Sequence, residues 1–385
     1  MQKSIVVVFI LFISFYQCDA QLIIKGKLMD AAGEPLPYAN ITLKNFGSCS
    51  NDNGLFEFKL PDVSSPVSIK ISSVGYETKI MKIQPVSPEV DLGLILLNRK
   101  VVELDEVTIR AKTTTVEETL LNIYQNLSKN YSSEPFHREL SARVRKFDAS
   151  NNLLQRTDVF FDEYYARGYT KNIKRMQNLV QGQVAGEGEF RTVDDEELFW
   201  IDLFFLRRHD AYSYSYPYTS RKAYSYKIDK NVYEYDGAPA IAINYELIDP
   251  SATKDGGWPN ATKLFGKMII NEEDYAILKI EETILLKNYD PKAKSEQEKK
   301  FNKAIQFKQL ISIINFKKYD GFYFLSDSHV ERINGYDNQS WAVAKADLVV
   351  SAYKRFQNEC NPCNIYFSKA KKDSEFWKNQ TGFPD

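Results

Sequence analysis

The feature that most constrains this fold is a series of long segments, joined by short turns, between residues 139 and 354. These segments read as long antiparallel strands that flank the turns. The turns are rich in Asn, Asp and Gly, which tolerate the backbone of a tight hairpin. The predicted pairs are 139–149 with 153–168, 223–235 with 238–248, 262–271 with 275–287, and 304–318 with 322–333, followed by a strand at 339–354. Hairpins in this order predict a large antiparallel sheet.

A helix precedes these strands. Thr115 and Glu118 have the spacing of a capping box, in which each side chain bonds the backbone of the other residue. An apolar stripe then repeats at helical spacing, and we expect it to pack on the sheet rather than on a partner: Val116, Leu120, Ile123, Tyr124 and Leu127. Residues 115–355 are therefore predicted to form one domain, a helix packed on an antiparallel sheet.

Shorter strands fill the region before the helix. "LIIKGKLMD", "YANITLKN", "LFEFKLP", "PVSIKISSVGYETKIMKI" and "VDLGLILLN" read as strands separated by turns at Gly33, Gly54 and Gly75. Short strands at regular spacing predict an antiparallel β-sandwich over residues 21–98.

The motifs of this region resemble the carboxypeptidase-regulatory-like domain. They are "GKLMDAAGEPLPYANITLKN", "SNDNGLFEFKLP" and "ISSVGYETKIMKI", in that order. The resemblance implies a transthyretin-like sandwich, a module common at the N-termini of exported Bacteroidetes proteins. Residues 21–98 contain no His, and Asp52 alone is too few ligands for a calcium loop. We therefore expect no peptidase activity here.

The run "ELDEVTIRAK", 103–112, resembles the junction between this domain and the plug of a TonB-dependent outer-membrane receptor. A receptor would continue into a barrel of many lipid-facing strands. Here the capped helix begins at Thr115, so residues 99–114 are predicted to be a linker.

Two stretches of the second region resemble envelope proteins. "NIYQNLSKNYSSEPFHRELSARVRKFD" is similar to a domain found behind the regulatory-like domain in uncharacterised Bacteroidetes proteins, with Arg138 and Glu139 in its aromatic-Arg-Glu element. "GKMIINEEDYAILKIEE" resembles the central hairpin of lipoprotein-carrier-like half-barrels. That resemblance implies a curved sheet wrapped around a helix and an apolar cavity.

Residues 1–20 read as a signal peptide. Lys3 precedes an apolar run at 5–15, and Ala20 offers a small residue before a cleavage site at Gln21. The run is too short to span a bilayer, and we expect no transmembrane segment in the mature chain. The protein is thus predicted to be exported, to the periplasm or the outer membrane. Lipidation at Cys18 is the alternative.

Three cysteines follow the leader: Cys49, Cys360 and Cys363. An exported chain meets an oxidising compartment. "CNPC" in the tail, 356–385, is therefore predicted to form a disulfide between Cys360 and Cys363. A redox pair is the alternative, although the thioredoxin-like context is missing.

No catalytic motif is found. His137, His209 and His329 lie in separate segments without metal-ligand spacing, and no nucleophile elbow occurs. We expect no enzyme activity, metal or cofactor, although a hydrolase with dispersed carboxylates stays open because such pairs leave no local signature. The net charge of −1 gives no reason to expect nucleic acid.

The strongest candidate for a site is an aromatic segment at 199–218. It consists of Phe199, Trp200, Phe204, Phe205, Tyr212, Tyr214, Tyr216 and Tyr218. Alternate tyrosines place their rings on one strand face, which suits stacking on a sugar or lining an apolar pocket. The alternative is that these rings cover the core of the sheet.

The sequence thus favours a mostly β, non-catalytic envelope protein that binds a hydrophobic or glycan ligand or has a structural role. The second hypothesis is an adaptor that docks on an outer-membrane protein partner through residues 21–98. The third is the hydrolase.

Overall fold

The structure of this protein is a computed structural model that describes part of the chain. The described residues are 22–37, 39–43, 46–51, 53–60, 66–73, 76–85, 87–99, 115–169, 175–186, 222–229, 233–235, 238–249, 261–286, 307–334 and 342–355. The predicted leader, the linker 100–114, the aromatic segment 199–218 and the tail 356–385 lie outside them.

The N-terminal part is a β-sandwich, as predicted. Its strands are β1 (Leu22–Asp30), β2 (Asn40–Leu43), β3 (Phe46–Cys49), β4 (Leu55–Leu60), β5 (Val67–Ser72), β6 (Lys79–Ile83) and β7 (Glu89–Leu97). They form one sheet in the order β4-β1-β7 and a second in the order β3-β2-β5-β6. Two details differ from the prediction. Strand β3 was not foreseen, and β1 pairs with β7 in parallel, so the sandwich is not wholly antiparallel.

Alternation along β1 builds the core of the sandwich. Every second residue from Leu22 to Asp30 is buried, and Ile24 and Leu28 are fully enclosed. Gly54 is required at the turn before β4. Its φ is +74°, and a Cβ there would lie 2.2 Å from the carbonyl oxygen of Leu28. A larger residue would therefore force β1 and the turn apart.

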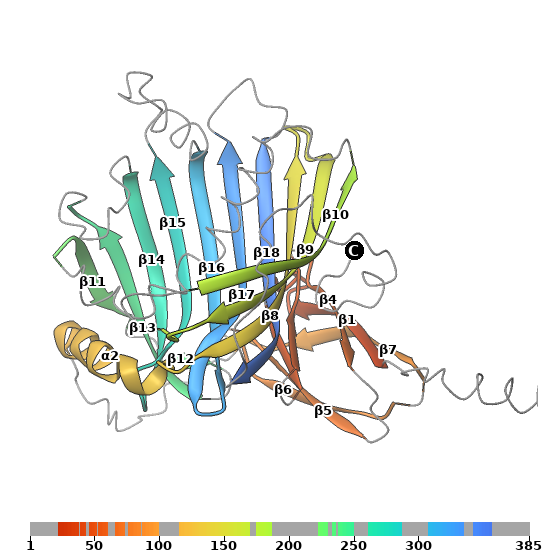
Figure 1. Cartoon of the computed structure of the whole chain (residues 1–385), viewed down its shortest axis with the longest axis horizontal. Coiled ribbons are helices and arrows are strands. Elements are labelled where there is room, and N and C mark those ends of the chain that lie inside the picture. Colours follow the sequence, from red (N-terminus) through yellow and green to blue (C-terminus); the bar gives the residue numbers. More distant parts are fainter. Residues whose placement is uncertain are drawn as a thin grey trace, which may run out of the picture.

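The large sheet has eleven strands (Figure 1). They are β8 (Phe136–Phe147), β9 (Leu153–Tyr165), β10 (Arg175–Gly186), β11 (Tyr224–Ile228), β12 (Tyr233–Tyr235), β13 (Ala238–Leu247), β14 (Ala261–Asn271), β15 (Ile277–Leu286), β16 (Phe307–Tyr319), β17 (Phe322–Asn334) and β18 (Val343–Arg355). The order is β10-β9-β8-β18-β17-β16-β15-β14-β13-β11, with β12 also on β13. All pairs are antiparallel, and the curved sheet stays open between β10 and β11.

The predicted hairpins are confirmed by the pairing of their strands. Residues that tolerate positive φ explain two of the turns. Asp320 and Gly321 both have positive φ between β16 and β17, and Asn151 has positive φ between β8 and β9. One predicted strand was wrong and one strand was missed. The segment 223–235 is two strands, β11 and β12, and β10 was not predicted at all.

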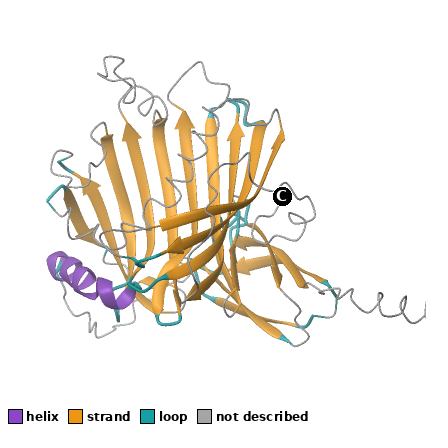
Figure 2. Cartoon of the chain, viewed as in Figure 1, coloured by secondary structure: helices purple, strands orange, loops and turns teal. Residues whose placement is uncertain are grey.

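Helix α2 (Val116–Asn130) lies at the β11–β13 end of the sheet (Figure 2). The predicted capping box is present in both directions, between Thr115 and Glu118. The apolar stripe is confirmed at Leu120, Ile123 and Leu127, which are buried. It was wrong at Tyr124, whose side chain is 38% exposed. Only the narrower stripe reaches the sheet.

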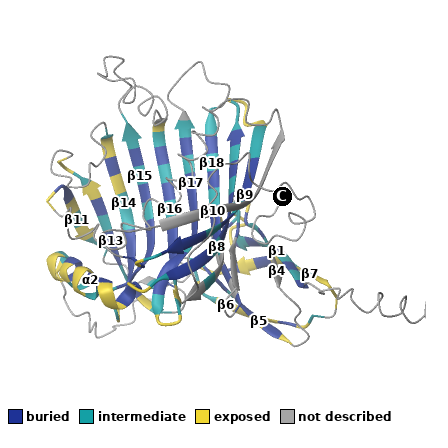
Figure 3. Ribbon diagram, in the orientation of Figure 1, coloured by how far each residue is buried: buried dark blue, intermediate teal, exposed yellow. Residues whose placement is uncertain are grey.

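The core runs along the face of the sheet that the helix covers. Alternate residues of the strands are buried on this face, as the dark blue stripes of Figure 3 show. It also contains a buried ion pair. Arg138, with 0% side-chain exposure, donates to Glu163 at 2.8 Å and to the hydroxyl of Tyr165 at 2.8 Å. Arg138 of the aromatic-Arg-Glu element therefore lies in the core, where the carboxylate of Glu163 balances its charge.

The sandwich meets the sheet along β3, which lies beside β17 and β18.

Candidate functional site

The first wall of the site is helix α2, whose position is set at its C-terminal end. The hydroxyl of Tyr131 accepts a hydrogen bond from the backbone N–H of Ile277 at 3.0 Å and donates to its carbonyl at 3.3 Å. The side chain of Asn130 donates to the carbonyl of Asp274 at 2.7 Å. These bonds join the end of the helix to the turn between β14 and β15. The side chains of the first two helical turns then face β11.

The second wall is β11, the last strand of the sheet. It pairs only with β13 in the sheet order, with Tyr224 opposite Leu247 and Tyr226 opposite Tyr245. Because side chains alternate along a strand, Tyr224 and Tyr226 share the face covered by α2, and Ser225 points to the other face.

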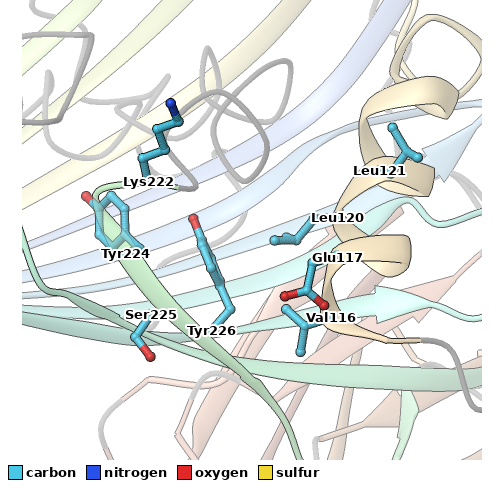
Figure 4. Close-up of a pocket in the computed structure, with 8 residues that line it drawn as sticks. All are labelled: Val116, Glu117, Leu120, Leu121, Lys222, Tyr224, Ser225 and Tyr226. Atoms are coloured by element: carbon cyan, nitrogen blue, oxygen red, sulfur yellow. The ribbon is translucent and has the colours of Figure 1, made fainter.

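A pocket of about 670 Å³ separates the two walls (Figure 4). In the figure the apolar side chains of α2 stand opposite the two tyrosine rings, with Lys222 above them and Ser225 on the far side of β11. The lining residues are Val116, Glu117, Leu120, Leu121, Lys222, Tyr224, Ser225 and Tyr226. One wall is thus mainly aliphatic, and the other is aromatic with polar tips.

The tyrosine wall is rigid, because a cluster of rings supports it. The centroids of Tyr224, Tyr226 and Tyr245 lie 5.9–6.3 Å apart, within the range of favourable aromatic pairs. The ring of Tyr245 packs over Gly266, its cross-strand partner, where a Cβ would lie 2.5 Å from the ring. A side chain at position 266 would therefore displace the cluster.

A buried carboxylate lies behind this wall. Glu282 is 2% exposed and accepts a hydrogen bond from the hydroxyl of Tyr245 at 3.1 Å. Burial, together with the nearby Tyr224 hydroxyl and Glu282 carboxylate, raises the pKa of the Tyr226 phenol. The phenol therefore stays protonated and remains a hydrogen-bond donor throughout the physiological pH range.

The histidines stand apart from the pocket. One cross-strand row on the opposite face of the sheet contains Lys227 of β11 and His329 of β17. His329 bonds Asp347 at 2.7 Å, and His137, also buried, bonds Asp162 at 3.3 Å. His209 lies outside the described residues. Among the described residues, no three His, Cys, Asp or Glu side chains are placed to hold a metal ion.

The residues predicted for ligand binding lie outside the described part of the chain and stay a prediction. These are Phe199, Trp200, Phe204, Phe205, Tyr212, Tyr214, Tyr216 and Tyr218. The same holds for the predicted disulfide between Cys360 and Cys363. The pocket that the structure does describe was missed. Its only local signal was the alternating "YSYKI" at the start of a predicted strand.

Comparison with known proteins identifies the first part of the chain. Residues 24–109 match the model of the CarboxypepD_reg-like domain. This match includes the whole described sandwich except its first two residues, and it extends ten residues beyond the described end of that region. No curated protein matches the chain at a significant level.

Three solved structures are similar to parts of this chain, at low sequence identity. A protein from Vibrio parahaemolyticus described as a putative outer membrane lipoprotein-sorting protein domain is 12% identical, over 64% of this chain and 96% of that one, with a TM-score of 0.29. A LolA superfamily protein from Nitrosomonas europaea is 11% identical, over 62% and 94%, with a TM-score of 0.24. A cohesin–X-dockerin complex from Acetivibrio cellulolyticus is 16% identical over 20% of this chain, with a TM-score of 0.17, and the match spans 56% of that protein's length.

Among the described residues, no helix has the length and apolar character needed to cross a membrane.

Proposed function

We propose that this protein is a non-catalytic binding protein of the cell envelope that holds the apolar part of an amphiphile between α2 and β11. The observation that carries the proposal is the pocket itself, with one aliphatic wall and one wall of tyrosines. Its volume of about 670 Å³ lies within the range of roughly 300–1,000 Å³ that is typical of small-ligand sites. The predicted export leader agrees with a role in the envelope.

The two walls suit a chain that lies along the helix. Val116, Leu120 and Leu121 offer aliphatic surface, and the faces of Tyr224 and Tyr226 offer flat apolar surface opposite them. Burial of each methylene group contributes about 0.8 kcal/mol, so affinity should rise by up to about fourfold for each CH2 that enters the pocket.

Displacement of a fluorescent apolar probe by alkyl maltosides tests the proposal. Maltosides with chains of about 8, 10 and 12 carbons, used below their micelle concentrations, should bind with rising affinity because burial scales with chain length. Maltose alone should not displace the probe. Binding of maltose without a chain would favour a glycan site instead, and equal affinities for all chains would refute the proposal.

A matched pair of variants locates the binding site. Leu121→Glu places a charge on the exposed part of the aliphatic wall, where the fold tolerates it, and should weaken binding at least tenfold. Leu153→Glu makes the same change at an exposed leucine of β9, outside the pocket, and should leave binding unchanged. Equal effects of the two variants would place the ligand elsewhere.

A second candidate function is the adaptor role, which exposed apolar residues of the sandwich favour. Ile80, Leu94 and Leu96 are each exposed by 45% or more. In cells, a photo-crosslinker at Leu96 should trap one dominant envelope protein, whereas a crosslinker at exposed Ile248 of the large sheet should not. A ladder of unrelated products at both positions would exclude specific docking.

A further inference from the structure

One end of the pocket carries a cation. Lys222 lies in the turn before β11, and its side chain extends above the ring of Tyr224 (Figure 4). Within the part of the chain that the structure describes, Lys222 takes part in no ion pair and no hydrogen bond. A cation at the end of a pocket can pair with an anionic group of a ligand.

Hydroxyl groups lie on the same side. In Figure 4 the phenol oxygens of Tyr224 and Tyr226 point toward the end of the pocket that Lys222 occupies. Tyr226 keeps its proton, because burial raises the pKa of its phenol. An ammonium and phenol donors at one end of an apolar pocket form a favourable setting for an oxyanion.

The other end of the pocket disfavours a second negative charge on the ligand. Glu117, in the first turn of α2, projects its carboxylate toward Tyr226, away from Lys222. Within the described residues Glu117 has no cationic partner either. A second acidic group farther along the ligand would face this carboxylate and be repelled.

Building on the proposed function, we infer that the natural ligand is an amphiphile with a single acidic head, a carboxylate or a phosphate, bound at Lys222, with its chain along Val116, Leu120 and Leu121. The cation selects the head, and the aliphatic wall of α2 holds the tail.

A series of ligands with the same 12-carbon chain tests this inference on the full-length mature protein. The heads are carboxylate, phosphate, neutral maltoside and trimethylammonium, and each ligand competes with the apolar probe. Because a partly exposed ion pair is weak, the two acids should bind about fivefold more tightly than the maltoside, and the cation should bind most weakly. The advantage of the acids should shrink at high salt, since exposed charges are screened. The carboxylate and phosphate arms distinguish a fatty-acid head from a phospholipid head.

Charge reversal at two lysines, one before β11 and one on it, provides the matched control. Lys222→Glu should remove the preference for acids and weaken their binding about tenfold, while the maltoside binds as before. Lys227→Glu, on β11 itself, changes the net charge equally but lies on the opposite face of the sheet and outside the pocket, so it should alter neither acid binding nor maltoside binding. Far-ultraviolet circular dichroism and the unfolding midpoint would verify that both variants are folded.

The outcomes separate the two proposals. If all four heads bind equally, or if both lysine variants weaken acid binding equally, the acidic head is refuted and the apolar pocket stands. If acids bind better but Lys222→Glu has no effect, the assignment of Lys222 is wrong. If no 12-carbon ligand binds, the proposed function fails, and this inference fails with it.

Discussion

The hydroxyl of Tyr131 joins helix α2 to the sheet, and its removal should destabilise the whole large domain. Tyr131 is 1% exposed, and its oxygen bonds both the N–H and the carbonyl of Ile277. The pairing register of β14 and β15 shifts next to Ile277. At this irregularity the Tyr131 hydroxyl hydrogen-bonds the backbone N–H and carbonyl of Ile277. Tyr131→Phe deletes this oxygen and keeps the ring.

The expected cost follows from the two backbone groups that lose their partner. A buried donor or acceptor without a partner costs about 1–3 kcal/mol, so the two together should cost about 2–6 kcal/mol. Packing changes little, because the ring contacts with Tyr169 and Phe316, at centroid distances of 6.2 and 6.3 Å, need no hydroxyl. The loss is large against a typical total stability of about 5–15 kcal/mol.

Urea unfolding followed by far-ultraviolet circular dichroism would measure this change, with amide exchange as a local readout. The midpoint should fall with little change in slope, and the Ile277 amide should exchange faster. Tyr319→Phe is the matched control, since the Tyr319 side chain stacks near Tyr353 and makes no hydrogen bond with described residues. A loss below about 0.5 kcal/mol for Tyr131→Phe, or equal losses for both variants, would refute the reasoning.

Two further perturbations test the sheet itself. Gly266→Ala should destabilise the protein by about 1–3 kcal/mol in urea unfolding, because the new Cβ would lie 2.5 Å from the ring of Tyr245; an unchanged midpoint would contradict the packing described here. Burial opposes ionisation of Asp347, but the charge and hydrogen bond of His329 and the neighbouring arginine outweigh it and lower the pKa of Asp347 to about 2. The carboxylate thus contributes about 2 kcal/mol, present above the unfolded pKa near 4 and lost as pH falls toward 2. Asp347→Asn should flatten the stability profile between those pH values, and acid titration of unfolding that gave parallel profiles would exclude this role.

The hairpins of the large sheet were predictable because their determinants are local. A turn such as Asp320–Gly321 needs positive φ, and these residue types supply it at low cost. The capping box of α2 was predictable for the same reason, because its two partners are three residues apart.

The errors in the predicted fold arose where contacts between distant parts of the chain determine the structure. Strand β10 lacks a clean alternation and forms by pairing along β9. The parallel pairing of β1 with β7 joins strands separated by the rest of the sandwich. Tyr124 fits the helical stripe, but only the sheet determines how wide that stripe is, and this ring lies beyond its edge.

The pocket was not predictable, because its two walls are about a hundred residues apart in sequence. Residues 116–121 looked like a packing face, and residues 222–226 looked like part of one long strand. They meet because α2 contacts both β17, in the middle of the sheet, and β11, at its end. Such long-range packing leaves no local pattern in the sequence.

Tyr131 and the pocket lie at opposite ends of helix α2, and this arrangement couples the stability of the domain to ligand binding. Fifteen residues at 1.5 Å each separate the ends by about 22 Å, so a tilt of roughly 5° at Tyr131 would move the pocket wall by about 2 Å. Among the described residues, the N-terminal end is held by its own capping box, which fixes the first turn but not the tilt of the axis. Tyr131→Phe should therefore weaken binding of a 12-carbon ligand several-fold under conditions where the variant is fully folded, while Tyr319→Phe binds normally. Unchanged affinity in a destabilised Tyr131→Phe protein would show that the packing of Leu120 and Ile123 alone sets the width of the pocket.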